Sequence, residues 1–189
     1  SSLAANTTGA ENTGLGFGAL ASNTTAGNNT AVGKSALLLN TTGSENTALG
    51  ESSLDANSTG ASNTALGRAS LSANTTANGN VAVGESAMRF STTGHSNVAV
   101  GASSLDANTT GYQSVAIGYA ALGAATTAHT NVAVGAYSLD ALTTGLYNVA
   151  VGKDALTEVT TSNDNTGVGA FALNNVTTGA SNTAIGFQA

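Results

Sequence analysis

The chain contains no cysteine, no proline and no tryptophan, and few of its residues are charged or aromatic. Without cysteine it can build neither a disulfide framework nor a thiolate metal site. Only four residues are Lys or Arg, against ten Asp or Glu, so the formal net charge is −6. No basic stripe is available to neutralise phosphates, which argues against nucleic acid or an anionic membrane surface as a partner. No run approaches the ~18 apolar residues that span a bilayer, so we expect no membrane insertion.

Glycine and small apolar residues take the place of the missing types. The chain has 24 Gly, and 41% of its residues are hydrophobic, which is enough to fold rather than to stay disordered. A glycine recurs at every seventeenth position from Gly16 to Gly186 without insertion, which defines eleven repeats. Because every copy then meets the same neighbours, the strict period predicts a solenoid that forms one repeat domain over residues 1–189.

Numbered from Asn12, the repeat reads N-[TV]-A-[VLI]-G-x-x-[AS]-L-x-x-N-T-T-G-x-x. Positions 2 to 4 have the alternation of a short strand, and we expect the larger residues at 2 and 4 to face the core. Position 5 Gly predicts a corner, Leu at position 9 a core residue, and Thr-Thr at positions 13 and 14 a second short strand. The fold class we predict is all-β: a parallel β-solenoid (β-roll) of eleven 17-residue coils, ~50 Å long at ~4.8 Å per coil.

Position 3 is Ala or Gly in every repeat. If positions 2 and 4 face inward, position 3 forms an uncharged outward row on which another backbone could pack closely. The alternative interpretation is a narrow coil in which position 3 faces a tight interior.

Position 1 is Asn in ten repeats and Ser114 in the remaining one. Amide side chains stacked at sheet spacing form hydrogen-bonded ladders, so we assign these residues a structural role. The predicted ladder consists of Asn12, Asn29, Asn46, Asn63, Asn80, Asn97, Asn131, Asn148, Asn165 and Asn182.

Charged and aromatic residues occupy only the variable positions of the repeat, which we expect to be outward corners. The candidate binding surface is formed by the aromatic residues Phe17, Phe90, Tyr112, Tyr119, Tyr137, Tyr147, Phe171 and Phe187. Aromatic side chains at such corners either stack on sugars or anchor a protein ligand, or they fill grooves between subunits.

No constellation of residues indicates catalysis, a cofactor or a metal. His95 and His129 occupy one repeat position two coils apart, roughly 10 Å at sheet spacing, too far to share a metal ion. Three aspartates at position 10 are likewise separated by two or three coils; they are Asp55, Asp106 and Asp140. Asn163-Asp164-Asn165 is an isolated resemblance to a calcium loop. We therefore predict that the chain is not an enzyme.

The motifs Asn-Val-Ala-Val-Gly and Ser114-Val115-Ala116-Ile117-Gly118 resemble the heads of trimeric autotransporter adhesins. The complete unit, as in residues 46–60, is also similar to repeat arrays beside bacterial and phage tail-fibre domains. The resemblance covers the whole chain and implies a left-handed β-roll, assembly as a homotrimer, and a location outside the cell, on the cell surface or on a virion. It names no ligand, but a host-surface protein or glycan is the kind of partner it implies.

We accordingly expect an extracellular structural or adhesive fibre segment. Two alternatives stay open: an ice-binding solenoid, because Thr recurs at position 14 of every repeat, and a purely mechanical filament subunit. The chain starts at position 7 with Ser1 and stops at position 8 with Ala189, without capping segments. From this we expect a piece of a longer fibre, or a subunit that polymerises end to end if it does not form a trimer.

Overall fold

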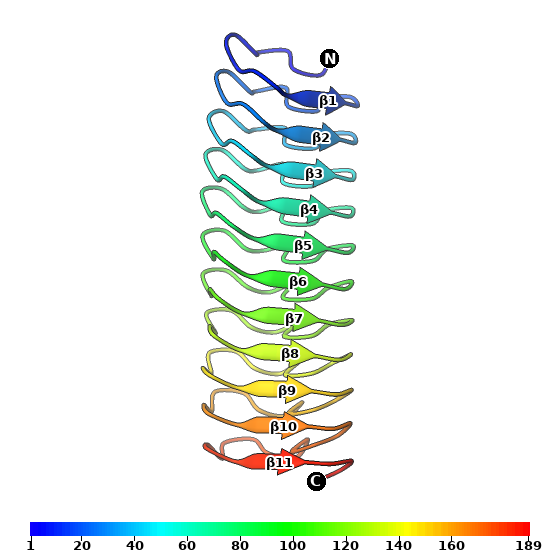
Figure 1. The fold of residues 1–189 in the computed structure, drawn as a ribbon, viewed down its shortest axis with the longest axis vertical. Coiled ribbons are helices and arrows are strands. Elements are labelled where there is room, and N and C mark those ends of the chain that lie inside the picture. The colour runs from blue at the N-terminus through cyan, green and yellow to red at the C-terminus, as the bar shows by residue number, and fades with distance from the viewer.

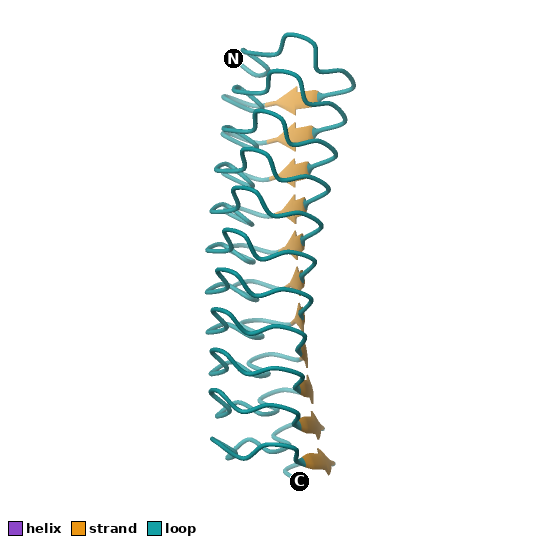
Figure 2. Ribbon diagram, turned by 90° about the vertical axis from the view of Figure 1, so that its left-hand side faces the viewer, coloured by secondary structure: helices purple, strands orange, loops and turns teal.

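The computed structural model describes all of residues 1–189 and consists of one parallel sheet with eleven three-residue strands and no helix (Figures 1 and 2). Neighbouring strands pair in sequence order, and each residue lies against its equivalent in the next repeat, for example Thr13 against Thr30. The strands are β1 (Thr13–Leu15), β2 (Thr30–Val32), β3 (Thr47–Leu49), β4 (Thr64–Leu66), β5 (Val81–Val83), β6 (Val98–Val100), β7 (Val115–Ile117), β8 (Val132–Val134), β9 (Val149–Val151), β10 (Thr166–Val168) and β11 (Thr183–Ile185). The predicted all-β parallel solenoid, with one coil for each repeat, is confirmed. No helix is available that could cross a membrane.

The coil is left-handed. In Figure 1 the strands lie on the near side and run from left to right while the chain descends from β1 to β11. The remainder of each coil returns behind them, and Figure 2 shows all the strands stacked along one side of the rod.

The glycine at position 5 forms the corner after each strand, as its fixed place in the repeat predicted. Gly101 has a φ of 135°, a region that only glycine enters readily. A Cβ on Gly101 would also lie 2.4 Å from the carbonyl oxygen of Gly118 in the next coil. The corner therefore requires glycine for its backbone angle and for the close stacking of coils.

Each coil contains three further turns in the left-handed region, at positions 7, 9 and 17. Ala69, Leu71 and Ser62 represent them, with φ of 56°, 50° and 57°. This region costs roughly 1–2 kcal/mol for each residue that has a Cβ. Hydrogen bonding between stacked coils must offset that strain, because the same turns recur in every repeat.

The interior is filled by Leu at position 9 and by Ala at positions 3 and 8, as in Leu105, Ala99 and Ala121, which are buried. The inward Leu is as predicted, but the predicted orientation of the strands is wrong. Position 3 faces the interior, as the alternative interpretation of a narrow coil had it, and positions 2 and 4 face outward. The leucine explains this orientation: a Cβ added to Gly167 would lie 3.2 Å from Cγ of Leu156, which leaves room for a methyl group and little more.

The Thr-Thr pair does not form the predicted second strand. Its backbone nevertheless joins successive coils, since the N–H of Thr41 donates to the carbonyl of Ser58 at 2.9 Å. The Thr41 hydroxyl donates to the same carbonyl at 3.0 Å. Position 13 thus uses its hydroxyl for bonding between coils, while position 14 is exposed.

Candidate functional surfaces

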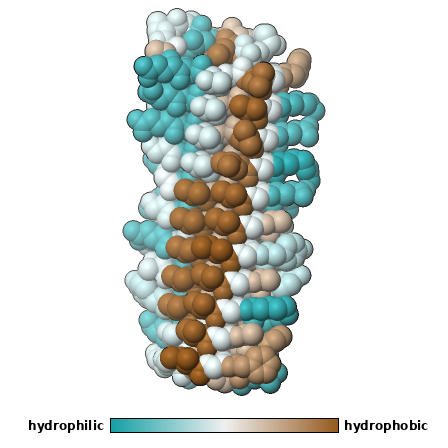
Figure 3. Space-filling model, turned by 45° about the vertical axis from the view of Figure 1, so that its right-hand side comes forward, coloured by the Kyte–Doolittle hydropathy of each residue, from teal (hydrophilic) through white to brown (hydrophobic).

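The outward face of the sheet carries an uninterrupted column of apolar side chains (Figure 3). We call this the apolar stripe. Its members at position 4 are Leu15, Val32, Leu49, Leu66, Val83, Val100, Ile117, Val134, Val151, Val168 and Ile185. Their side chains are partly or fully solvent-exposed, with 40% exposure at Ile117 and 74% at Ile185. No charged residue occurs among the eleven strands.

The stripe is twice as wide in the middle of the rod as near the N-terminus. Position 2 is Thr in β1 to β4, β10 and β11, but it is Val in the five strands β5 to β9. The second column of the stripe consists of Val81, Val98, Val115, Val132 and Val149. The alternation of a three-residue strand does not reveal which face is inside, and the prediction that these valines lie in the core is wrong.

Two edges border the sheet face, and most of the aromatic residues lie on them. We call positions 16 and 17, just before each strand, the start corner, and positions 6 and 7, just after it, the end corner. For β7 the start corner is Tyr112 and Gln113, and the end corner is Tyr119 and Ala120.

On the start corner, four rings from successive coils form a continuous row. His95 and Tyr112 stack with ring centroids 5.2 Å apart, and Tyr112 and His129 stack at 4.3 Å, both with a 12° angle between ring planes. Tyr147 meets His129 edge-on at 6.4 Å. The sequence predicted the separation of the two histidines but not that Tyr112 fills the space between them. Because stacking covers the ring faces, this row presents mainly ring edges to solvent.

The end corner changes character along the rod. Near the N-terminus it carries ion pairs between successive coils, Lys34 with Glu51 at 3.1 Å and Arg68 with Glu85. Towards the C-terminus it carries edge-on aromatic pairs and the ion pair of Lys153 with Asp154. The aromatic pairs are Tyr119 with Tyr137 at 5.3 Å and Phe171 with Phe187 at 6.0 Å.

The remaining aromatic residues of the candidate surface stand apart from these pairs. Phe90 lies at position 11, away from both corners, with the Arg89 guanidinium 4.3 Å from its ring centroid. Phe17 is 75% exposed and contacts no other ring. The eight predicted residues therefore do not form one surface.

Position 1 forms a hydrogen-bonded ladder along the whole rod. Oδ1 of Asn63 accepts the backbone N–H of Asn80 at 3.0 Å, and Nδ2 of Asn63 donates to the carbonyl of Ala77 at 2.8 Å. Ser114, the one residue at position 1 that is not asparagine, still provides a hydrogen-bond acceptor: its hydroxyl oxygen accepts the N–H of Asn131 at 3.2 Å.

A second amide ladder, at position 12, was not predicted. Nδ2 of Asn57 donates to Oδ1 of Asn40 at 2.9 Å, and Asn74 donates to Asn57 at 2.7 Å. The sequence signal was the asparagine of each Asn-Thr-Thr triplet, which also creates glycosylation sequons. From Asn23 to Asn108 these asparagines are buried, so the folded rod does not offer them for modification. After Asn108 the ladder gives way to the buried apolar residues Ala125, Leu142 and Val159.

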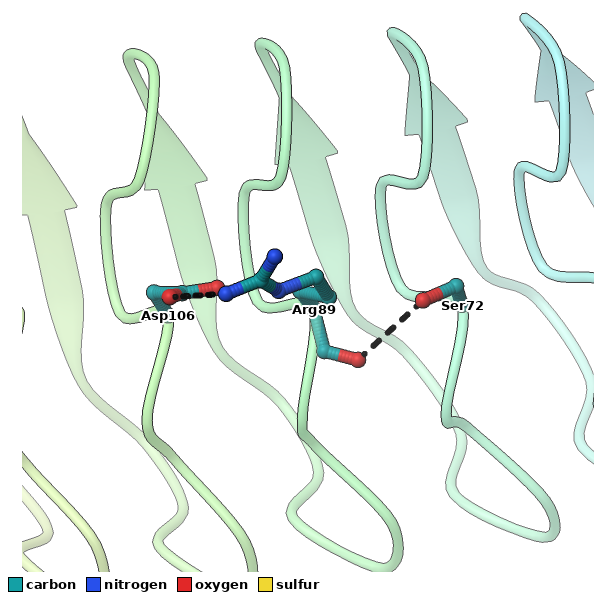
Figure 4. A network of polar contacts seen from close by, with 3 residues as sticks. All are labelled: Ser72, Arg89 and Asp106. Atoms are coloured by element: carbon teal, nitrogen blue, oxygen red, sulfur yellow. Dashed lines mark hydrogen bonds and ion pairs between the residues drawn. The ribbon is translucent and has the colours of Figure 1, made fainter.

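Position 10 holds the partly buried aspartates, on separate coils as predicted. Burial raises the pKa of Asp106, and the Arg89 guanidinium opposes this with an ion pair at 3.1 Å (Figure 4). Ser72 donates to the Arg89 carbonyl at 3.4 Å in the same network. Burial also raises the pKa of Asp55, and that of Asp140, to which the charge of Asp154 adds.

Two residues of the isolated calcium-like triplet, Asn163 and Asn165, form hydrogen bonds to the neighbouring coil. Oδ1 of Asn163 accepts the N–H of Leu146 at 2.8 Å, and Asn165 belongs to the position 1 ladder. No group of three or more His, Asp or Glu side chains converges anywhere in the chain.

A single file of threonines runs along the rod at position 14. All eleven are exposed: Thr8, Thr25, Thr42, Thr59, Thr76, Thr93, Thr110, Thr127, Thr144, Thr161 and Thr178. There is no pocket beside these threonines or elsewhere on the surface of the rod.

Comparisons with protein-family models, with curated proteins and with solved structures give no match.

Proposed function

We propose that the chain is a structural rod of an extracellular fibre or surface adhesin, and that it associates side by side with copies of itself through the apolar stripe. The observation that carries this proposal is the stripe itself. It is continuous over eleven strands, free of charge and exposed on the single chain. A contiguous apolar surface of this kind on a soluble rod is typical of a protein interface.

A second copy of the chain is the partner that fits the stripe. A partner that covers side chains in every coil must present groups at the same spacing of one coil, all along the sheet from β1 to β11. Another copy of the chain has that spacing because it is built from the same coils. On the end corner near the N-terminus, the charges beside the stripe are already paired within the chain, as Lys34 with Glu51, so covering these pairs leaves none of their charges without a partner.

The adhesive part of the proposal concerns the faces that such an assembly leaves in solvent. Positions 10, 11 and 14 lie away from the stripe, and positions 10 and 11 differ from coil to coil. A host-surface protein or a glycan is the ligand class that the resemblance to adhesin heads implies. The stacked coils, joined by buried amide ladders, support a structural role.

The experiment is a charge substitution on the stripe. The variant Ile117→Glu with Val134→Glu should be monomeric by sedimentation velocity at concentrations where the unchanged chain is a discrete oligomer. Both side chains face outward, so the far-ultraviolet circular dichroism should remain that of the folded rod. The matched control is Thr110→Glu with Thr127→Glu on the exposed threonine file of position 14, which should leave the oligomer intact. A monomeric unchanged chain would contradict the proposal.

Ice binding is a second candidate, because the position 14 threonines form an exposed file at regular spacing. The neighbouring position 13 hydroxyls are not free to form a second file, since Thr41 and Thr109 donate to carbonyls of the next coil. A single file covers less surface than paired files, which is why we rank this candidate second. Thermal hysteresis at millimolar chain concentration, abolished in Thr93→Lys with Thr127→Lys, would establish it in place of the first proposal.

A further inference from the structure

The apolar stripe is too narrow to account for a stable association by itself. Even two side-chain columns about 10 Å wide along the whole rod of ~50 Å would cover only about 500 Å², and the second column spans only β5 to β9. A specific interface usually covers about 800 Å² on each partner. If copies of the chain associate through the stripe, groups beside it must contribute to the contact.

Aromatic groups lie beside the stripe at the strands where it is widest. The start corners of β6, β7 and β8 carry the stacked rings His95, Tyr112 and His129. The end corners of β7 and β8 carry Tyr119 and Tyr137. These strands fall within the five that have Val at both outward positions.

The distribution of valine along the rod favours one relative orientation of two copies. In a parallel, in-register pair, each of the five double-valine strands lies against its counterpart, and all eleven strands are covered. In an antiparallel pair centred on β6, strands β5 to β9 lie against β7 to β3, so only three of the five meet a double-valine strand. An antiparallel pair centred on β7 matches all five but leaves β1 and β2 uncovered.

Parallel copies that face each other have strands running in opposite directions across the interface. The start corner of one copy then lies against the end corner of the other at the same level of the rod. At β7 this brings Tyr112 of one copy to Tyr119 of the other, and at β8 His129 to Tyr137. At β3 it brings Glu45 near Glu51, whose charge Lys34 of the same chain balances at 3.1 Å.

We infer that the aromatic corners at β6 to β8 complete the contact between copies, with the start corner of one chain packed against the end corner of the next. This inference rests on the proposed self-association through the stripe. It assigns Tyr112, Tyr119, Tyr137 and the two histidines to the interface and not to ligand binding. When parallel rods repeat this contact around a common axis, they form a closed ring.

Cysteine cross-linking tests this contact directly, because the chain has no cysteine of its own. The variants Tyr112→Cys and Tyr119→Cys are each prepared alone, co-expressed with distinguishable tags, and oxidised under mild conditions. We expect the co-expressed pair to shift to a disulfide-linked dimer, while either variant alone stays monomeric on a non-reducing gel. A cross-link within one chain is excluded, since Ser114 to Gly118 alone span ~13 Å at ~3.3 Å per residue, beyond the ~7 Å limit between Cα atoms.

Thr110→Cys, co-expressed with Tyr119→Cys, is the control and should give no dimer. A chain that carries both tyrosine substitutions should form closed covalent rings whose size gives the number of copies. Efficient cross-linking of Tyr119→Cys with itself would show that like corners meet and would overturn the inference. So would the absence of any cross-link in a chain that sediments as an oligomer. Sedimentation as a monomer would instead refute the proposed self-association, and this inference with it.

Discussion

Replacement of Asn63 by alanine should destabilise the rod by about 2–4 kcal/mol. Asn63 is fully buried, and its Oδ1 is the acceptor for the backbone N–H of Asn80, which is bonded to no backbone carbonyl. A buried N–H that loses its acceptor costs about 1–3 kcal/mol. The carbonyl of Ala77 loses its 2.8 Å bond from Asn63 and keeps only a 3.3 Å bond from Asn74, which adds to the loss.

The substitution Asn63→Ser distinguishes the contribution of the hydrogen-bond acceptor from that of the rest of the asparagine side chain. Ser114 shows that a serine hydroxyl can accept the N–H of the next coil at 3.2 Å. Asn63→Ser should therefore lose about half as much stability as Asn63→Ala, since one orphaned N–H is restored. Guanidinium denaturation followed by circular dichroism measures both variants, with equal slopes required for the comparison. If Asn63→Ala loses less than about 0.5 kcal/mol, or if alanine and serine are equivalent, the ladder does not stabilise the fold as we argue.

Three further changes test other parts of the structure. Gly101→Ala should cost about 3 kcal/mol or more, because its Cβ meets the Gly118 carbonyl oxygen at 2.4 Å and its φ is 135°; a wild-type denaturation midpoint would refute the corner geometry. Ala69→Gly should stabilise by about 0.5–1 kcal/mol, since glycine removes the strain of φ 56° but costs some entropy; the same denaturation assay decides. Asp140→Asn should raise the melting temperature at pH 7. Burial raises the pKa of the Asp140 carboxyl in the folded chain, so the protonated carboxyl favours folding at low pH. This contribution to stability is lost as the pH rises above the ordinary pKa of 3.8, and asparagine avoids the loss because it carries no charge. Between pH 3 and 7 the melting temperature should fall less for Asp140→Asn than for the unchanged chain. The control Asp164→Asn, at an exposed corner, should not reduce this fall. An equal fall of the melting temperature in the two variants would contradict the role of Asp140.

The two amide ladders show why one asparagine position varies and the other does not. At position 1 the side chain accepts a backbone N–H, and that donor is present in every coil whatever its neighbours are. At position 12 the amides bond to one another and to a carbonyl that position 1 also serves, as Asn57 and Asn46 both donate to Gly60. In later coils Leu142 and Val159 take the place of asparagine at position 12. When neighbouring amides are replaced together, the donor and its acceptor disappear at the same time, so little stability is lost.

The repeat itself determined the coil length, the parallel register of equivalent residues, the inward leucine at position 9 and the glycine corner. These features follow from local rules: a fixed period allows only one stacking register, and a residue at φ near 135° must be glycine. The sequence also placed the charged and aromatic residues at the variable positions of the coil, although it could not tell that the position 10 aspartates are partly buried or which of the rings meet.

Only the tertiary structure decided which face of each strand is inside. A strand of three residues alternates equally well in either phase, so Val98, Ala99 and Val100 could have packed with the valines inward or outward. The leucine of position 9 settles the phase, because it fills the narrow coil and leaves space for no more than the methyl group of Ala99. The valines are thereby placed on the outside, where they form the stripe on which the proposed assembly depends.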